Sequence, residues 1–167
     1  MALSTPEPLG DAHDISDFDC GTPSLNDWLQ RRARSNQRHG FTLVMVVHDD
    51  GGVVAFYGLA PTSIEAHLLP RRIRTGQPPN PVPCLLIGQL AVDRRYQGRG
   101  LGDQLVLHAL ERVVASATIS GGRALLVNAI DASAATFWEA WDFQPLSSNP
   151  LLLYRSLDDI RATLNAI

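Results

Sequence analysis

Three glycines, at positions 98, 100 and 102, alternate with other residues soon after an apolar run over 85–92. A glycine has no Cβ and tolerates positive φ, so the backbone here can approach a ligand closely. A helix is predicted to begin near Leu101, and the unpaired amides of its first turn, with the helix dipole, favour an anion. Arginines at positions 94, 95 and 99 add positive charge. The stretch therefore predicts a phosphate site that suits a diphosphate better than a single phosphate.

Two common nucleotide-binding motifs do not fit these residues. A P-loop needs the pattern G-x-x-x-x-G-K-[ST], and the chain contains no lysine. A dinucleotide fingerprint needs G-x-G-x-x-G with an acidic residue about 20 positions further on. Here the spacing is G-x-G-x-G, and Thr118 stands at the expected acidic position. A glycine-rich turn without any ligand is the plain structural alternative.

The residues do match a third pattern, Gln-x-x-Gly-x-Gly, which runs from Gln97 to Gly102. Directly after a strand that ends in Leu90-Ala91-Val92-Asp93, this pattern resembles the signature of the GNAT family of N-acetyltransferases. The resemblance implies an α/β fold in which helices flank a mixed, mostly antiparallel central sheet. It also implies that the loop holds the pyrophosphate of acetyl-CoA. The cofactor-binding residues implied by the resemblance are Leu90, Ala91, Val92, Arg95, Gln97, Gly98, Arg99, Gly100, Gly102 and Asp131.

Three segments resemble one branch of that family, the TacT and AtaT type of toxin. They are Phe18–Leu29, Phe56–Ala60 and Leu90–Gly102. This resemblance implies an enzyme that acetylates the α-amine of aminoacyl-tRNA and so blocks translation. It further implies a homodimer that is neutralised by a ribbon-helix-helix antitoxin.

The expected active-site strand supports an α-amine as the acceptor. Between Leu85 and Val92 there is no carboxylate or histidine to act as a general base. An α-amine, with a pKa of about 7.7–8.0, is already partly neutral near pH 7, whereas a lysine amine is not. Backbone amides near Val92 would stabilise the developing oxyanion. A small amine or a protein N-terminus is the alternative acceptor.

One position departs from the family pattern. Related acetyltransferases carry Phe-Tyr in the helix after the fifth strand, and that tyrosine protonates the leaving thiolate. This chain has Phe137-Trp138, and an indole N–H is not a proton source at neutral pH. Three catalytic interpretations remain: a slower enzyme with Trp138 bonded to the sulfur, rescue by Tyr154 or Tyr57, or a coenzyme-binding protein without turnover. The structural alternative is that Trp138 fills the core.

The formal net charge is −3, which argues against nucleic acid, but the arginines are clustered. Four lie between Trp28 and His39 without any acidic residue, and six lie between Ala66 and Arg99 against one acid. Arginine suits phosphate, so both clusters are candidate RNA contacts. The candidate RNA-binding residues are Arg31, Arg34, Arg38, Arg71, Arg72 and Arg74. A solvated helix face is the simpler explanation of the first three.

The 167 residues, 45% of them hydrophobic, predict a single domain, with residues 1–12 unstructured. No apolar run reaches the ~18 residues of a membrane span, and two cysteines are too few for a disulfide framework. Reduced thiols and a cytoplasmic location are expected. The five histidines show no metal-ligand spacing, so no metal is assigned.

Hydrophobic periodicity places the elements around the loop. A helix should follow Thr22 and carry the first three candidate arginines on one face. Strands are expected over 42–48 and 53–60, joined by a hairpin at 49–52, with a third strand over 62–67. The later elements are a loop over 68–83, a helix from Leu101, a buried strand over 123–129, a helix over 133–141, a strand over 151–155 and a helix capped by Ser156.

Overall fold

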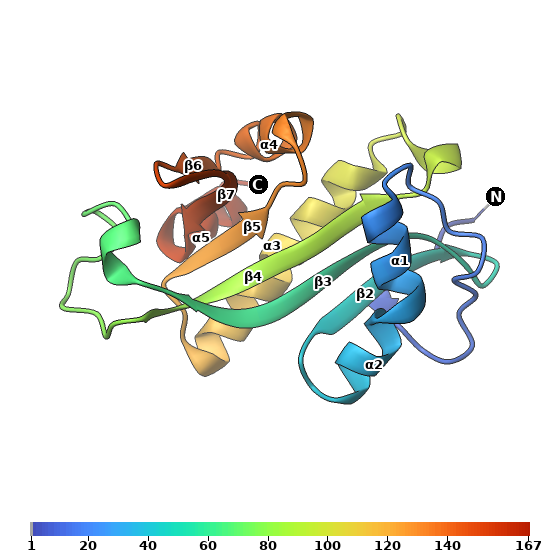
Figure 1. Cartoon of the computed structure of the whole chain (residues 1–167), viewed down its shortest axis with the longest axis horizontal. Coiled ribbons are helices and arrows are strands. Elements are labelled where there is room, and N and C mark those ends of the chain that lie inside the picture. Colours follow the sequence, from blue (N-terminus) through green and yellow to red (C-terminus); the bar gives the residue numbers. More distant parts are fainter. Residues whose placement is uncertain (1) are drawn as a thin grey trace. The chain divides into compact units, whose positions relative to one another are not determined.

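The computed structural model describes residues 2–167, and Figure 1 shows the course of the chain. The strands, α-helices and 3₁₀ helices follow in the order β1 (Glu7–Pro8), α1 (Pro23–Arg31), α2 (Ala33–Arg38), β2 (Leu43–Asp49), β3 (Gly52–Ile64), η1 (Ala66–Leu68), β4 (Val82–Val92), η2 (Arg94–Tyr96), α3 (Leu101–Ser120), β5 (Ala124–Asn128), α4 (Ala132–Glu139), β6 (Gln144–Leu146), β7 (Asn149–Ser156) and α5 (Leu157–Asn165).

The strands are hydrogen-bonded in the order β1-β2-β3-β4-β5-β7-β6. β2 pairs with β3, and β5 with β7, in antiparallel fashion, whereas β4 and β5 are parallel. Parallel pairing needs a crossover connection, and α3 provides it between β4 and β5. The predicted fold class, a mixed and mostly antiparallel sheet flanked by helices, is confirmed.

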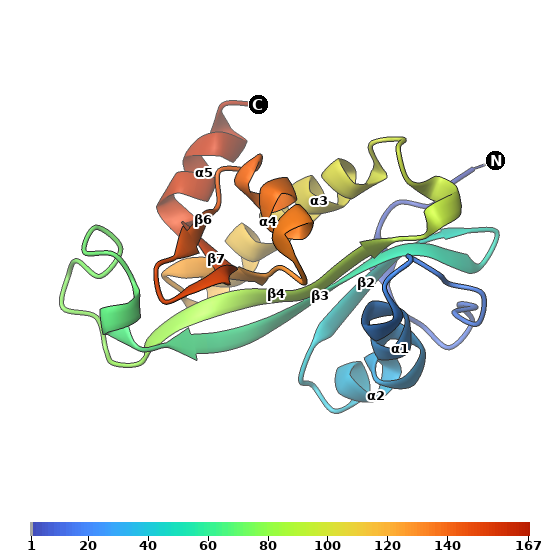
Figure 2. The ribbon, with the colours of Figure 1, turned by 45° about the horizontal axis from the view of Figure 1, so that its top comes forward.

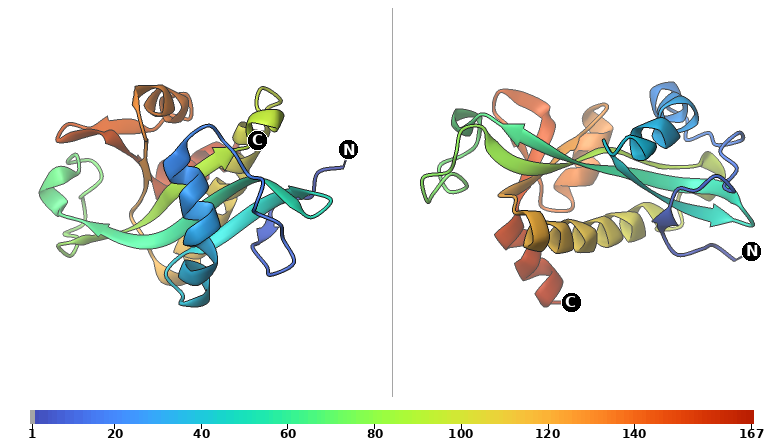
Figure 3. Two further views of the ribbon diagram at one scale, coloured as in Figure 1. Left: turned by 45° about the vertical axis from the view of Figure 1, so that its right-hand side comes forward. Right: turned by 90° about the horizontal axis from the view of Figure 1, so that it is seen from below.

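The chain divides into two compact units, and the first comprises Met1–Ala60 and Gly88–Ala109. Its core joins Leu29 of α1 to Val44, Val46 and Phe56 of β2 and β3, all of them fully buried. Alternate residues of a strand face the same side, so this face of β2 lies against the first two helices. Figure 2 and Figure 3 show α1 and α2 on this face, with the beginning of α3 on the other.

The second unit comprises Pro61–Ile87 and Leu110–Ile167. Its core includes Ile73 and Val82 of the first segment and Leu126 and Tyr154 of β5 and β7. Within this unit α4 and α5 lie on opposite faces of β5 and β7 (Figure 3). The sequence predicts a single domain. The division into two units cuts through β3, β4 and α3, each of which contributes residues to both units.

Several local predictions are confirmed. Asp50 and Gly51 have φ values of 49° and 90°, as a two-residue hairpin turn between β2 and β3 requires. Helix α1 begins at Pro23 after Thr22, and α3 begins at Leu101. Ser156 caps α5 by accepting a hydrogen bond from the Asp159 amide.

One predicted strand is wrong, and one observed strand was not predicted. No separate strand occupies residues 62–67, because β3 continues without interruption to Ile64 and is followed by η1. Pro61 lies within this strand, where a proline ordinarily suggests its end. The short strand β6, which pairs with β7, was not predicted, because three residues give no measurable alternation.

The N-terminal prediction is also wrong for the residues that the structure describes. Instead of being unstructured, Glu7 and Pro8 form β1 against β2, and Leu9 is buried in the core. Likewise, the single helix expected to carry Arg31, Arg34 and Arg38 is two helices, since Arg32 between them leaves helical geometry at φ −122° and ψ −27°.

Among residues 2–167, no helix is both long enough and apolar enough to cross a membrane.

Candidate functional site

The glycine loop lies in the first unit, between the end of β4 and the start of α3. Gly98 and Gly100 both have a φ of 78°, the left-handed region that favours glycine. A Cβ added to either would meet nothing within 4 Å, so the space above the loop is open. The backbone here is therefore exposed for the approach of a ligand, as the sequence predicts.

The first turn of α3 adds hydrogen-bond donors to this space. The amide of Gln104 makes the first intrahelical bond, at 3.1 Å to the Gly100 carbonyl. The amides of Leu101 and Gly102 therefore precede the helical ladder and have no carbonyl four residues behind them within the helix. With the dipole of a 20-residue helix behind them, these donors favour an anion.

The arginines around the loop carry less uncompensated charge than the sequence suggests. Arg94 forms an ion pair with Asp19 at 3.0 Å, and Arg95 forms one with Asp93 at 3.0 Å. The Arg99 guanidinium lies over the Tyr96 ring, 5.3 Å from its centroid. Two of the three expected charges are thus shared with carboxylates, which the sequence alone could not show.

Asp93 is almost fully buried, at 1% exposure, although no catalytic role was predicted for it. Its carboxylate accepts hydrogen bonds from the Asp19 amide and from both the backbone and the guanidinium of Arg95. Burial raises the pKa of this carboxyl, but the bonds from Arg95 and Asp19 outweigh burial and hold the pKa below its usual range. The buried carboxylate therefore fixes the turn that leads into the glycine loop.

The side chain of Gln97 also stabilises the glycine loop. Its amide nitrogen donates to the Val92 carbonyl at 2.8 Å and to the Cys20 carbonyl at 3.2 Å. The sequence predicts a contact between Gln97 and pyrophosphate, but the side chain here bonds to protein carbonyls. The structure thus links the segment before α1 to the glycine loop, a connection that no sequence pattern indicated.

The last residues of β4, which precede the glycine loop, differ in their burial. Ala91 is 6% exposed, whereas Leu90 and Val92 are half-buried. The Asp93 amide donates to the Val54 carbonyl of β3 at 2.8 Å, which holds the end of β4 in place. Leu90, Ala91 and Val92 therefore lie beside the loop in the same unit.

The second unit holds the three remaining cofactor-binding and catalytic candidates, one at the N-cap of α4, one within α4 and one on β7. Asp131 is the N-cap of this helix, and its side chain accepts a hydrogen bond from the Ala134 amide at 2.9 Å. Trp138 is 4% exposed and packs edge-on against Phe137 and Phe143, with centroid distances of 5.4 and 5.2 Å. Most of the indole thus belongs to an aromatic cluster.

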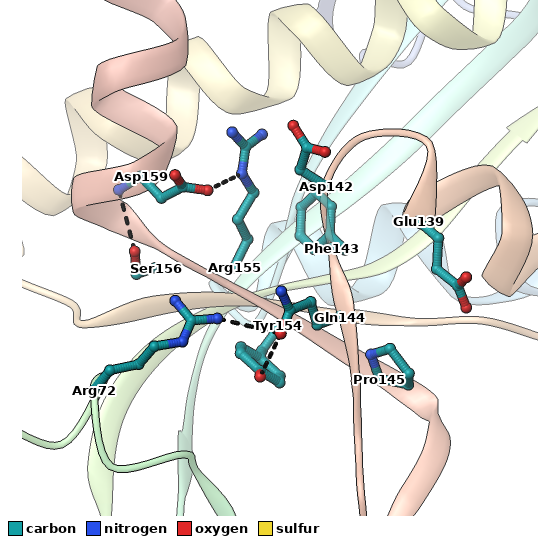
Figure 4. Close-up of a pocket in the computed structure, with 10 residues that line it drawn as sticks. All are labelled: Arg72, Glu139, Asp142, Phe143, Gln144, Pro145, Tyr154, Arg155, Ser156 and Asp159. Carbon is teal, nitrogen blue, oxygen red and sulfur yellow. Dashed lines mark hydrogen bonds and ion pairs between the residues drawn. The ribbon is translucent and has the colours of Figure 1, made fainter.

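Tyr154 of β7 lines a polar cavity of about 660 Å³ in the same unit (Figure 4). Its hydroxyl donates to the Gln144 Oε1 at 3.0 Å, and that Gln144 oxygen also accepts from Arg72 at 3.2 Å. Arg155, buried at 4% exposure, bonds to Asp159, to the Trp141 carbonyl and to Thr163. The tyrosine hydroxyl is therefore engaged by protein groups in the structure.

The candidate RNA-binding arginines differ in accessibility. Arg31, Arg38, Arg71 and Arg72 are exposed. Arg34 is half-buried, and its guanidinium donates to the carbonyls of Gly10 and His13. Arg74 is also half-buried, and its Nε has no hydrogen-bond partner. Of the first four, Arg31 pairs with Asp27 at 3.9 Å and Arg72 donates to Gln144, whereas Arg34 holds the N-terminal segment.

A cluster that the sequence did not indicate joins Glu7, His13 and His48 in the first unit. Each imidazole Nε2 lies 2.8 Å from the same Glu7 oxygen, and each Nδ1 accepts a backbone amide, from Gly10 or Gly51. An Nδ1 that accepts leaves the proton on Nε2, which then donates to Glu7. A metal-bound histidine instead uses its second nitrogen as a donor, so this arrangement is a hydrogen-bonded clamp.

Comparison with known proteins gives consistent matches over nearly the whole chain. Residues 37–145 match the acetyltransferase (GNAT) domain family. A tRNA-acetylating toxin of Mycobacterium tuberculosis is 41% identical over 161 residues, which cover 96% of this chain and 96% of that protein. The solved structure of AtaT complexed with acetyl-methionyl-tRNAfMet has a TM-score of 0.88 and 28% identity, and the match covers 98% of this chain and 99% of that one.

A second solved structure contains a tyrosine-to-phenylalanine mutant of the AtaT toxin, bound to the C-terminus of the antitoxin AtaR and to acetyl-CoA. It has a TM-score of 0.84 and 29% identity, and the match covers 99% of both chains.

Proposed function

Because this chain belongs to the GNAT family of acetyltransferases, we propose that it moves the acetyl group of acetyl-CoA onto the α-amine of an aminoacyl-tRNA. In this proposal it is the toxin of a toxin–antitoxin pair, and the modified tRNA can no longer serve translation. The protein is an N-acetyltransferase, and acetyl-CoA is its acetyl donor. The acceptor and the toxic role are what the proposal adds.

The open glycine loop is the structural observation that carries the coenzyme part of this proposal, and the 41% identity to a tRNA-acetylating toxin supports the acceptor. A diphosphate needs several donors at close range, and Gly98, Gly100 and the first amides of α3 offer them without any Cβ in the way. We assign the pyrophosphate to this loop, with Gly98, Arg99, Gly100 and Gly102 beside it. Gln97 and Arg95 support the loop through the Val92 carbonyl and the Asp93 carboxylate.

The chemistry needs little assistance from acidic or basic side chains. A neutral amine attacks the thioester carbonyl, the C–N bond forms, the C–S bond breaks, and the amine releases its proton. An α-amine with a pKa of about 7.7–8.0 is partly neutral at physiological pH, so an active-site strand without a base is sufficient. Backbone amides at the end of β4, near Val92, stabilise the oxyanion in this scheme.

The coenzyme leaves as a thiolate, the conjugate base of a thiol with a pKa of about 8.5. A thiolate of this basicity is a tolerable leaving group without a general acid. Trp138 stands where the family resemblance expects a tyrosine, and its indole is largely enclosed by Phe137 and Phe143. Tyr154 is the alternative acid, once its hydroxyl leaves Gln144. We assign weakened general acid catalysis to this site.

The RNA acceptor is assigned to the exposed arginines of the two basic clusters. Arg31 and Arg38 in the first unit, and Arg71 and Arg72 in the second, are exposed, and of these Arg31 also pairs with Asp27. Arg34 and Arg74 are half-buried, so in this proposal they contribute mainly to the positive electrostatic potential that attracts the RNA.

The partners follow from the same proposal. The chain acts in the cytoplasm, where charged tRNA is found, as a homodimer that a ribbon-helix-helix antitoxin neutralises. AtaT, which is similar to this chain, is bound to the C-terminus of the antitoxin AtaR in a solved structure. Size-exclusion chromatography with light scattering tests the dimer, and co-expression with a candidate ribbon-helix-helix protein tests the antitoxin.

A second candidate function is favoured by Trp138. A chain without the usual proton donor can bind acetyl-CoA and act through a partner without turnover. Transfer to a small amine or a protein N-terminus is the remaining catalytic alternative, because neither acceptor requires the basic clusters.

The deciding experiment incubates the protein with labelled acetyl-CoA and a panel of charged tRNAs. We expect label on the aminoacyl group of at least one tRNA. The matched control is Gly100→Val, because a β-branched residue is disfavoured at a φ of 78° and projects into the open space above the loop. Calorimetry should show that this variant no longer binds acetyl-CoA. Unchanged affinity in Gly100→Val would remove the basis of the assignment, and transfer to small amines alone would select the alternative acceptor.

A further inference from the structure

Helix α2 ends in a motif that fixes the direction of the next side chains. Gly40 follows the helix with a φ of 79°, and its amide donates to the Gln37 carbonyl at 3.1 Å. The Phe41 amide donates to the Asn36 carbonyl at 2.9 Å. These two bonds form a Schellman motif, which commonly places the residue in the position of Phe41 against the helix.

Phe41 instead points to solvent. It is 65% exposed, and its ring stacks on the His39 imidazole, with centroids 6.1 Å apart and planes 25° from parallel. The imidazole is itself held, because Nδ1 lies 2.8 Å from the Ser35 carbonyl and therefore donates to it. The two rings thus form an exposed and ordered surface, the His39–Phe41 ring pair.

The stretch of sequence that carries the ring pair is rich in arginine. No acidic residue occurs between Trp28 and His48, whereas four arginines do. Arg38 directly precedes the ring pair and is exposed, and the Arg31 side chain is 80% exposed, with its Nε 3.9 Å from the Asp27 carboxylate. Figure 2 shows α2 and the connection to β2 at the periphery of the first unit.

We propose that the His39–Phe41 ring pair is a stacking platform for an unpaired base of the RNA substrate. The proposal rests on the proposed function, since an aminoacyl-tRNA provides unpaired bases at its acceptor end and in its loops. Proteins that bind single-stranded nucleic acid combine aromatic rings with a basic surface in this way. The arginines attract the backbone, and the rings accept a base of any sequence.

The charge distribution favours RNA over a second copy of the chain. A symmetric dimer through this surface would bring the same arginines of both copies together, and like charges at an interface oppose association. A dimer interface would also need a larger apolar surface than this one. The large exposed apolar residue that follows Phe41 most closely in the chain is Leu43, and it is only 38% exposed.

The test measures binding of uncharged tRNA by fluorescence anisotropy over a range of salt concentrations. Phe41→Ala should weaken binding about 5- to 160-fold, the range for loss of one base stack, and leave the slope of log K against log salt unchanged. Phe41→Trp should retain wild-type affinity, because any flat aromatic ring can stack. Arg38→Gln should instead reduce the slope by about 0.7–0.9.

Ile119→Ala is the matched control for removal of an exposed apolar side chain. Ile119 is 89% exposed on α3 and lies outside the basic stretch, so RNA affinity should not change. Light scattering on each variant detects any change of assembly. The proposal is overturned if Phe41→Ala binds tRNA like the wild type, or if its affinity falls only because a dimer dissociates.

The platform and the proposed function fail in different ways. A wild-type protein that binds tRNA through Phe41 but transfers no acetyl group supports the platform and contradicts the function. Transfer to charged tRNA with an unchanged KM for tRNA in Phe41→Ala supports the function and contradicts the platform. Absence of tRNA binding by the wild type contradicts both.

Discussion

At the scale of single residues, hydrogen bonds to carboxylate and carbonyl oxygens hold the glycine loop in its conformation. Asp93 is buried and takes hydrogen bonds from Arg95 and from the Asp19 amide, and Gln97 bonds to Val92 and Cys20. The loop is therefore held by protein groups before any coenzyme arrives, and such preorganisation lowers the cost of binding.

Asp93→Asn should weaken acetyl-CoA binding while the chemical step changes little. An asparagine places a donor where the carboxylate now accepts from Arg95 or Asp19, so the loop loses its fixed position. We expect the KM for acetyl-CoA to rise about tenfold, the equivalent of ~1.4 kcal/mol, with kcat within about twofold. Asp19→Asn is the milder companion variant, because Asp19 is only half-buried whereas Asp93 is almost fully buried. A fall in kcat at unchanged KM would contradict this role.

Trp138→Tyr should raise kcat at saturating acetyl-CoA. A tyrosine supplies the proton donor that an indole lacks, and general acid catalysis is typically worth about 10²–10⁴-fold, of which we expect at least tenfold here. Trp138→Phe is the matched control, because it removes the indole from the cluster with Phe137 and Phe143 without adding a hydroxyl. If Trp138→Tyr leaves the rate unchanged and Tyr154→Phe abolishes it, Tyr154 is the acid.

Cys84 should resist alkylation at pH 8. Burial raises the pKa of this thiol to about 11, so only about one molecule in a thousand carries the reactive thiolate at that pH. Burial also raises the pKa of Cys20, but its side chain is half-buried and should react first. Mass spectrometry after brief iodoacetamide treatment locates the label, and rapid labelling of Cys84 would show that this part of the second unit opens readily.

At the scale of elements, hydrophobic period and cap residues predict most of the sheet and helices. The glycine loop, the α3 start at Leu101 and the hairpin at Asp50-Gly51 were predicted because each depends on local conformational preferences. The contacts of Asp93 and Gln97 were not predicted, because they join residues up to 77 positions apart. The same holds for the Glu7–His13–His48 clamp, whose residues have no characteristic spacing.

The segment between β3 and β4 carries a separate prediction about RNA. Arg71→Glu with Arg72→Glu should lower kcat/KM for a charged tRNA at least tenfold and make the remaining activity less dependent on salt, because two phosphate contacts are lost. Transfer to a small amine should be unaffected and serves as the control. Equal losses on both acceptors would mean that the loop supports the fold, through the bond from Arg72 to Gln144 for example.

At the scale of the whole molecule, carboxylates with lowered pKa values couple stability to pH. The bond from His13 lowers the pKa of Glu7, and bonds from Gly21 and Asn26 lower that of Asp19. A carboxyl with a lowered folded-state pKa stabilises the fold above its unfolded value, and this contribution is lost as pH falls through the folded value. Because the pKa of Asp93 is lowered too, we expect Tm to fall steadily below about pH 4.5.

Calorimetric scans between pH 3 and 7 check this expectation. In Asp93→Asn, Tm should fall less steeply with decreasing pH than in the wild type. A Tm that is independent of pH over this range would contradict the assigned hydrogen bonds.

The bonds from Gln97 to Cys20 and from Asp93 to Asp19 also have a consequence for the order of synthesis. A ribosome releases residues from the N-terminus onward, so the segment that contains Asp19 and Cys20 waits until residues 93–97 have been made before either bond can form. The coenzyme loop is therefore completed only after more than half of the chain exists. Under the proposed function, the nascent chain therefore cannot acetylate charged tRNA through that half of its own synthesis.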